Sequence, residues 1–176
     1  EAVLKFAKEN HINIVSPAIQ GNNMLMGNPN VSKVTPSYAT QAEELAKYIA
    51  EKFAGQNIIL FNSANAKDKP YNNTFKKTAN ALLQQSKADS VTEVTFTTLK
   101  NSISKTKTNI IVIPSTNKSF ISEAVNKLYQ HKQENMKDSI FVFGMSNWRE
   151  MESLDFGYLK TLYAHLSSYT FIDYSN

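Results

Sequence analysis

The sequence contains no cysteine, which excludes disulfide bonds, thiolate nucleophiles and cysteine metal sites together. Long hydrophobic runs are also missing. The runs at residues 58–61 and 110–113 have the length of strands, whereas a helix that crosses a bilayer needs about 20 apolar residues. The first residues lack the pattern of a signal peptide and resemble the middle of a helix. We therefore expect a chain that does not span a membrane and that was cut from a longer protein.

Arginine is nearly absent, because Arg149 is the only arginine among 19 basic residues. The formal net charge of +4 comes from lysines that are spread along the chain. Proteins that read a DNA sequence use arginine for bidentate contacts to guanine. The composition therefore predicts a solvated, lysine-rich surface and no nucleic-acid partner.

Glycine and histidine patterns predict no cofactor and no metal. The five glycines do not occur in the spacings of phosphate-binding loops, in which backbone amides cradle the anion. The three histidines, His11, His131 and His165, are far apart in the sequence, and none belongs to a helical pair that would place two ligands on one metal.

Catalytic motifs are missing as well. The chain has no G-x-S-x-G sequence, so a serine hydrolase of the α/β type has no visible nucleophile. Ser115 follows a predicted strand, and we interpret its hydroxyl as a binding group. The acidic pairs Glu43 with Glu44 and Glu150 with Glu152 fit solvated helix or turn surfaces better than acid and base catalysis. We predict that the chain is not an enzyme, and an enzyme of flavodoxin-like architecture remains the least favoured alternative.

The N-terminal part predicts a helix over residues 1–10, a short buried strand from Ile12 to Val15 and a turn-rich loop over residues 21–30. A longer helix follows, capped by Ser37 or Thr40. Its apolar residues recur at helical spacing as far as Phe53, and a glycine two residues later ends it.

A regular alternation of strands and helices follows. Short apolar runs predict strands, and amphipathic segments between them predict helices. Strands that are apolar throughout are typical of parallel sheets covered on both faces. The sequence thus predicts an α/β fold with three αβα layers and a flavodoxin-like, Rossmann-like parallel sheet. The expected strands are 57–61, 91–96, 109–113 and 139–143, and the expected helices are 71–85, 99–104 and 119–130. In the sheet, strand 57–61 is expected to lie between strands 91–96 and 109–113.

The predicted core gathers apolar side chains from these strands and from the first long helix. It comprises Leu45, Ile49, Ile59, Phe61, Ile111, Ile113, Phe141 and Phe143. Beyond it, residues 156–162 predict a helical turn, and residues 162–171 predict an extended segment. The aromatic residues there fit packing in the core and hinge better than a recognition surface; they are Tyr158, Tyr163, Tyr169, Phe171 and Tyr174.

Several strand and loop sequences resemble the type I periplasmic binding proteins. Ile14-Val15-Ser16-Pro17, followed by Val34-Thr35-Pro36-Ser37 and Gln41, resembles a strand of the first lobe and a crossing into the second. The strands at 57–61, 109–113 and 140–143 are similar to those of the second lobe in the same order. The resemblance implies a lobe-one fragment with the first hinge crossing at 1–36, the second lobe at 37–161 and a second crossing at 162–176.

The C-terminal part, with Trp148, residues 152–155 and residues 171–174, resembles a Bacteroidetes subgroup of this family. In that subgroup the domain is often attached to LysM repeats, which bind peptidoglycan. The resemblance implies an exported protein of the periplasm or cell envelope.

The function implied by the resemblance is non-catalytic binding or sensing of a small polar solute, with amino acids as one candidate class. The alternative is an envelope domain that binds other proteins, is associated with peptidoglycan and has lost the small ligand. We expect self-association of the chain if apolar surface that the missing lobe normally covers is left exposed. The expected ligand contacts are Ser16, Ala18 and Gln20 from the first lobe, and Ser63, Ser115, Thr116, Ser146 and Trp148 from the second.

An ammonium ligand has no obvious acidic partner in this set. No carboxylate follows Pro114 until Glu123, and none follows Gly144 until Glu150. Because a buried ammonium without a countercharge is costly, this favours a different solute or a protein partner.

Overall fold

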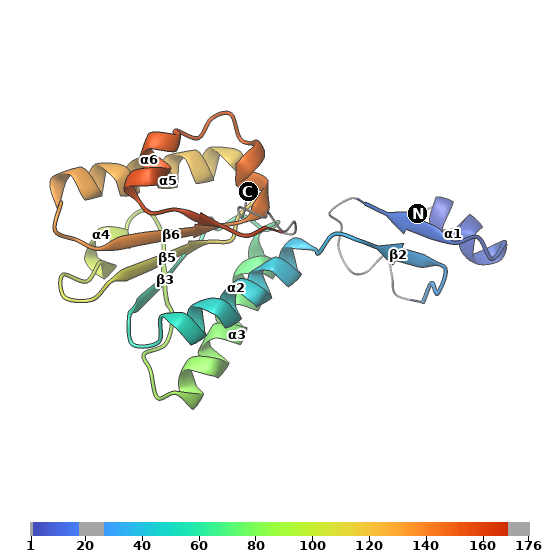
Figure 1. The fold of residues 1–176 in the computed structure, drawn as a ribbon, viewed down its shortest axis with the longest axis horizontal. Helices are drawn as coiled ribbons and strands as arrows, with labels where there is room; N and C mark the ends of the chain where they lie inside the picture. The colour runs from blue at the N-terminus through green and yellow to red at the C-terminus, as the bar shows by residue number, and fades with distance from the viewer. Residues whose placement is uncertain (1, 18–26, 169–176) are drawn as a thin grey trace, which may run out of the picture.

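The computed structural model describes residues 2–17 and 27–168, which form a small N-terminal unit and a larger α/β unit. Figure 1 shows the two units side by side, joined by the segment that enters α2. The N-terminal unit contains α1 (Ala2–Glu9), β1 (Ile14–Ser16) and β2 (Val31–Lys33). The two strands pair in parallel.

The strand predicted at residues 12–15 forms two residues later, at Ile14–Ser16, and the prediction that this segment is buried is wrong. Val15 is 64% exposed and Ile12 is 45% exposed. Successive side chains of a strand point to opposite faces, and α1 is the only helix in this small unit. One face of the two-stranded sheet therefore has no described element to cover it.

The helix α2 spans Tyr38–Lys52, and its N-cap is Ser37, one of the two predicted capping residues. The Ser37 Oγ accepts a hydrogen bond from the Thr40 backbone N–H at 3.1 Å, which pairs an N–H group that the helix itself leaves free. Ala42, Leu45, Ala46 and Ile49 form its buried face. The helix ends before Gly55, whose positive φ of 86° suits glycine.

The main sheet has five parallel strands in the order β4-β3-β5-β6-β7. They are β3 (Asn57–Phe61), β4 (Thr92–Val94), β5 (Asn109–Ile113), β6 (Ile140–Gly144) and β7 (His165–Leu166). The placement of β3 between β4 and β5 confirms the predicted order. The strand predicted at residues 91–96 is shorter than expected, because β4 covers only Thr92–Val94, and the extended segment near residue 165 forms an edge strand of two residues.

Helices cover both faces of the sheet. Figure 1 shows α2 and α3 (Lys69–Gln85) on one side, with α5 (Lys118–Glu134) and α6 (Phe156–Thr161) on the other. The short helix α4 (Leu99–Ser102) follows β4, and the 3-10 helix η2 (Ser146–Glu150) follows β6. This arrangement confirms the predicted three-layer α/β fold.

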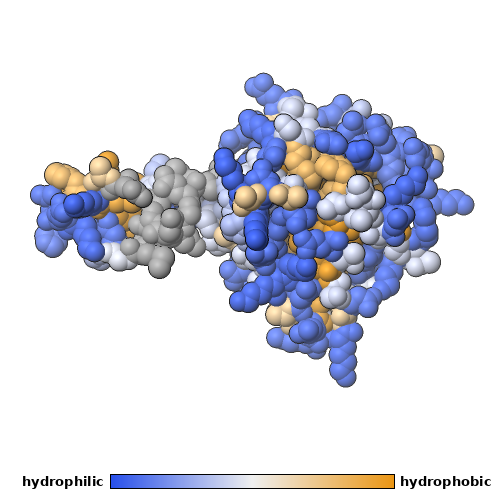
Figure 2. Space-filling model, turned by 180° about the vertical axis from the view of Figure 1, so that it is seen from behind, coloured by the Kyte–Doolittle hydropathy of each residue, from blue (hydrophilic) through white to orange (hydrophobic). Residues whose placement is uncertain are grey.

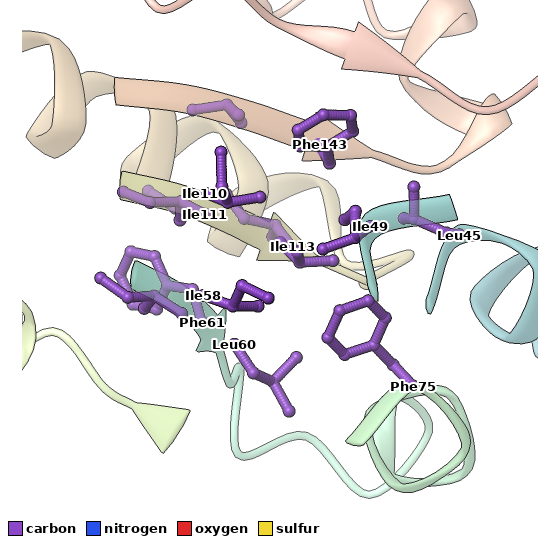
Figure 3. Close-up of a cluster of buried hydrophobic side chains, with 14 of the residues drawn as sticks. Leu45, Ile49, Ile58, Leu60, Phe61, Phe75, Ile110, Ile111, Ile113 and Phe143 are labelled. Carbon is purple, nitrogen blue, oxygen red and sulfur yellow. The ribbon is translucent and has the colours of Figure 1, made fainter. Parts of the chain in front are cut away.

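The hydrophobic core lies between the sheet and its helices (Figure 3). Seven of the eight predicted core residues are buried, which confirms the register of the strands: Leu45, Ile49, Ile59, Phe61, Ile111, Ile113 and Phe143. Phe141 is only partly buried. β7 pairs with residues 143 and 144 of β6, so on that side of β6 no strand of the described residues lies beside Phe141.

A buried acid, Asp138, stabilises the turn before β6. Asp138 accepts hydrogen bonds from Lys105 Nζ at 2.8 Å and pairs with His131 Nε2 at 2.9 Å. Burial alone raises the pKa of Asp138, but the hydrogen bonds from Lys105 and His131 outweigh burial and hold this pKa below its ordinary value.

Because the pKa of Asp138 is lower in the folded than in the unfolded chain, its charge stabilises the fold above the unfolded pKa of about 3.9. This contribution is lost as the pH falls from about 4 through the lower folded pKa. We expect Asp138→Asn to lower the urea midpoint at pH 5, and to lower it by less as the pH falls below about 4. Urea titrations of both proteins between pH 3 and 7 measure this difference. A difference that does not change with pH would contradict the assignment.

Candidate functional site

The polar residues predicted for the second lobe lie along one edge of the main sheet. Ser63 follows β3, Ser115 and Thr116 follow β5, and Ser146 follows β6. These three strands are neighbours in the sheet and parallel, so their carboxyl ends meet at the same edge. Open α/β sheets bind ligands in the crevice outside this edge. The structure therefore brings these four residues to the same edge of the sheet.

Three of the predicted residues converge on a buried acid, Asp68. Its side chain is 0% exposed. Oδ2 accepts hydrogen bonds from Ser63 Oγ at 2.7 Å and from Ser115 Oγ. Oδ1 accepts from the backbone N–H of Thr116 at 3.1 Å and from Thr116 Oγ1 at 3.2 Å. Asp68 thus ties the loop after β5 to the loop between β3 and α3.

These contacts use the hydroxyl protons of the two serines. The same oxygens also accept backbone hydrogen bonds, Ser63 Oγ from Asn65 and Ser115 Oγ from Asn117. A serine hydroxyl has one proton to donate. Ser63 and Ser115 therefore organise the loops around Asp68, and their contact with a ligand stays a prediction.

Sequence reasoning missed Asp68. The available signal was the segment Asp68-Lys69-Pro70. Proline is common in the first turn of a helix, and an acidic side chain is stabilising at a helix N-terminus. The sequence has no carboxylate close after β5 or β6, but the structure brings one to this edge, Asp68, from the loop after β3. Its oxygens are occupied by hydroxyl and amide donors.

The loop after β6 carries a second set of polar groups. Ser146 Oγ, Asn147 Oδ1 and Trp148 Nε1 are buried and have no hydrogen-bond partner among the residues described. Trp148 is 1% exposed. Its indole ring lies against Gly144, where a Cβ atom would come within 2.6 Å of the ring. Trp148 therefore packs in the core, with its polar nitrogen unpaired.

Two tyrosines at the start of α2 and α3 add an aromatic wall that sequence reasoning also missed. Both helices begin at the edge of the sheet where the strands end. The rings of Tyr38 and Tyr71 meet edge to face with centroids 5.7 Å apart. Burial raises the pKa of Tyr71, and the nearby charge of Asp68 raises it further. Tyr71 therefore stays a neutral hydrogen-bond donor at neutral pH.

An apolar groove of about 450 Å³ adjoins this edge between α2 and β7. Its walls include Leu45, Tyr48, Phe143 and Leu166. The ring of His165 stacks on Phe143 with centroids 4.9 Å apart.

The predicted residues of the first lobe are only partly described. Ser16 ends β1, is half-buried and belongs to the N-terminal unit. Its carbonyl accepts a hydrogen bond from the Val34 N–H at 3.2 Å. Ala18 and Gln20 lie outside the described residues. The contact of Ser16, Ala18 and Gln20 with a ligand stays a prediction.

Within residues 2–17 and 27–168, no group of three histidine, aspartate or glutamate side chains is placed to hold a metal ion. Among the histidines, the buried His131 pairs with Asp138, and the exposed His165 stacks on an aromatic ring. No helix in this described part combines the length and the hydropathy that a membrane crossing requires.

No protein-family model and no curated protein matches the sequence. Solved structures do match its fold. A putative branched-chain amino acid ABC transporter protein from Rhodospirillum rubrum has a TM-score of 0.63 at 10% identity, over 91% of this chain and 45% of its own. A substrate-binding protein from Desulfitobacterium hafniense in complex with leucine has a TM-score of 0.56 at 16% identity, over 85% and 44%.

A leucine-binding protein from Thermotoga maritima has a TM-score of 0.55 at 14% identity, over 91% of this chain and 43% of its own. The chain thus spans less than half the length of these proteins. At such low identities the likeness concerns the fold. The chain has the α/β fold of a lobe of the type I periplasmic binding proteins, and its structural neighbours are substrate-binding proteins of branched-chain amino acid ABC transporters.

Proposed function

We propose that the chain is a non-catalytic solute-binding module, which holds a small polar molecule at the carboxyl ends of its strands. One observation carries this proposal: Ser146, Asn147 and Trp148 place three buried and unpaired polar atoms at the end of β6. A buried polar group without a partner costs about 1–3 kcal/mol. A ligand that accepts from the indole N–H and donates to the two oxygens would recover this free energy.

Amino acids are the ligand class that we propose first. The structural neighbours include proteins with bound leucine and bound valine, and the apolar groove beside α2 offers room for an aliphatic side chain. The unpaired set is neutral, and the oxygens of Asp68 are already engaged. A ligand ammonium would therefore meet neutral acceptors here, so another small solute with both donors and acceptors fits the same site.

The proposed location is the periplasm or cell envelope, because the neighbours are substrate-binding proteins of ABC transporters. Attachment to LysM repeats and origin in the Bacteroidetes subgroup are also proposals, supported by the sequence resemblance alone. Attachment to LysM repeats would place the module near peptidoglycan.

An envelope domain that binds proteins is the second candidate, and the N-terminal unit favours it. Val3, Phe6, Val15 and Val34 are all more than half exposed there, and Figure 2 shows hydrophobic surface on this unit. Soluble monomers seldom expose large apolar patches. A partner protein or a second copy of the chain would cover these residues.

Titration of the ¹⁵N-labelled chain with single amino acids distinguishes the two candidates. Trp148 is the only tryptophan, so its indole N–H gives one resonance. We expect leucine or valine at millimolar concentration to shift this resonance and the amides of Ser146 and Asn147, because the ligand pairs with their unpaired atoms. The half-buried Ser122 and the exposed Ser153, which share a hydrogen bond on the α5 side, serve as control positions.

An unchanged indole resonance with every amino acid, up to tens of millimolar, would remove amino acids as the ligand class. Concentration-dependent shifts confined to α1, β1 and β2 would favour self-association through the N-terminal unit.

A further inference from the structure

Gln41, in the first turn of α2, is a buried polar residue with three partners in separate segments. Its side chain is 6% exposed. Oε1 accepts hydrogen bonds from the Ser146 N–H at 3.3 Å and from Ser167 Oγ at 3.0 Å. Nε2 donates to the Pro36 carbonyl at 3.4 Å. One side chain therefore holds three segments of the chain together.

Each partner has a different place in the fold. Pro36 lies in residues 34–37, which join the N-terminal unit to α2 (Figure 1). Ser146 begins the loop after β6 that carries the unpaired polar atoms. Ser167 follows β7 at the edge of the sheet. The amide thus touches the proposed ligand loop, the segment that enters the α/β unit and the segment after β7.

A neutral amide is the side chain that fits this position. Two donors face Oε1 and a carbonyl faces Nε2, which fixes the orientation of the amide. A carboxylate would accept from Ser146 and Ser167 but would face the Pro36 carbonyl without a proton. A methionine of similar length would leave the Ser146 N–H unpaired.

We propose that Gln41 is a positioning residue that couples the ligand loop after β6 to the segments at residues 34–37 and 167–168. This inference rests on the proposed function of that loop. A ligand that moves the Ser146 backbone must stretch or shorten the hydrogen bond to Gln41, and the same amide holds Pro36 and Ser167. Ligand binding at this loop therefore changes the hydrogen bond that holds the segment connecting the two units.

Hydrogen exchange of the Ser146 amide in the ¹⁵N-labelled chain tests the coupling without any ligand. We expect Gln41→Glu at pH 7.5 to speed exchange at Ser146 roughly tenfold relative to wild type, the size expected when a buried hydrogen-bond network is broken. The amide resonances of Thr35 and Ser37 should shift in the same variant. At pH 4 the introduced carboxyl is protonated and again both donates and accepts, so exchange should return to the wild-type rate.

Each variant is compared with wild type at the same pH, so that the titration of nearby groups affects both exchange rates alike. These are Glu44 and His165, which line the adjoining groove, and the charge of Arg149, which donates to Ser168 at 3.3 Å. Gln56→Glu is the matched control, because Gln56 also accepts from a backbone amide, that of Thr108 at 2.9 Å, but lies before β3. It should leave exchange at Ser146 unchanged.

Gln41→Met gives a second reading in which no charge is introduced. Faster exchange at Ser146 without recovery at pH 4 is expected there. Wild-type exchange at Ser146 in both Gln41 variants would overturn the inference. So would faster exchange in Gln41→Glu that persists at pH 4, because the effect would then be structural damage. The proposed function is tested separately by the amino-acid titration, so a chain that binds no amino acid can still show the coupling.

Discussion

Trp148→Ala is expected to lower the free energy of unfolding by about 3–5 kcal/mol, the usual cost of truncating a large buried aromatic residue. Trp148 is among the largest fully buried side chains and packs against Gly144. Urea unfolding followed by far-UV circular dichroism measures the loss, since the variant has no tryptophan fluorescence. Phe156→Ala is the control, because Phe156 is 74% exposed; its effect should stay within about 0.5 kcal/mol.

Gly144→Ala tests the same contact from the other side. The new methyl group would lie 2.6 Å from the indole ring, which is closer than carbon atoms approach, and overpacking of this kind costs about 1–3 kcal/mol. In the double variant the ring is gone and the methyl group has space. We therefore expect the double variant to be about as stable as Trp148→Ala alone, which gives a coupling energy of about 1–3 kcal/mol. Additive losses would show that the ring does not rest on Gly144.

The sequence predicted most of the fold because the signals are local. Each central strand is a short apolar run, and the helix beginning at Ser37 combines a capping residue with regular apolar spacing. The order of the strands follows from repeated βα units, which leave few arrangements for a parallel sheet. Burial was predicted less well where it depends on neighbours. Val15 and Phe141 have the right pattern, but each lies where no further described strand or helix covers it.

The candidate site was predicted only in part, because its contacts join distant positions. Asp68 lies 47 residues from Ser115 in the sequence, and Gln41 lies 105 residues from Ser146. No local pattern identifies such partners. Sequence reasoning could place serines at strand ends, since those positions follow from the fold class. It could not foresee that a buried carboxylate uses their protons.

Asp68→Ala is expected to lower the free energy of unfolding by about 3 kcal/mol or more, because hydrogen bonds to a charged group contribute about 1.5–3 kcal/mol each and are not additive. The substitution leaves the Thr116 backbone N–H and the hydroxyls of Ser63 and Ser115 without their acceptor. Hydroxyls can rotate toward other acceptors, whereas a backbone N–H cannot. Urea unfolding gives the loss, and amide exchange should rise most at Thr116.

Two further variants separate the charge from the network. Asp68→Asn keeps the shape: with its oxygen toward the Thr116 N–H, its NH₂ group can donate to the hydroxyl oxygens of Ser63 and Ser115 once these rotate. It should therefore lose less free energy of unfolding than Asp68→Ala, and the remaining loss reports the charge. Asp89→Ala is the matched control, because Asp89 is an exposed carboxylate paired with Lys107, and exposed pairs contribute about 0–1 kcal/mol. If Asp68→Ala were as mild as Asp89→Ala, Asp68 would not hold the two loops together. The serines at the strand ends would then be free to donate to a ligand.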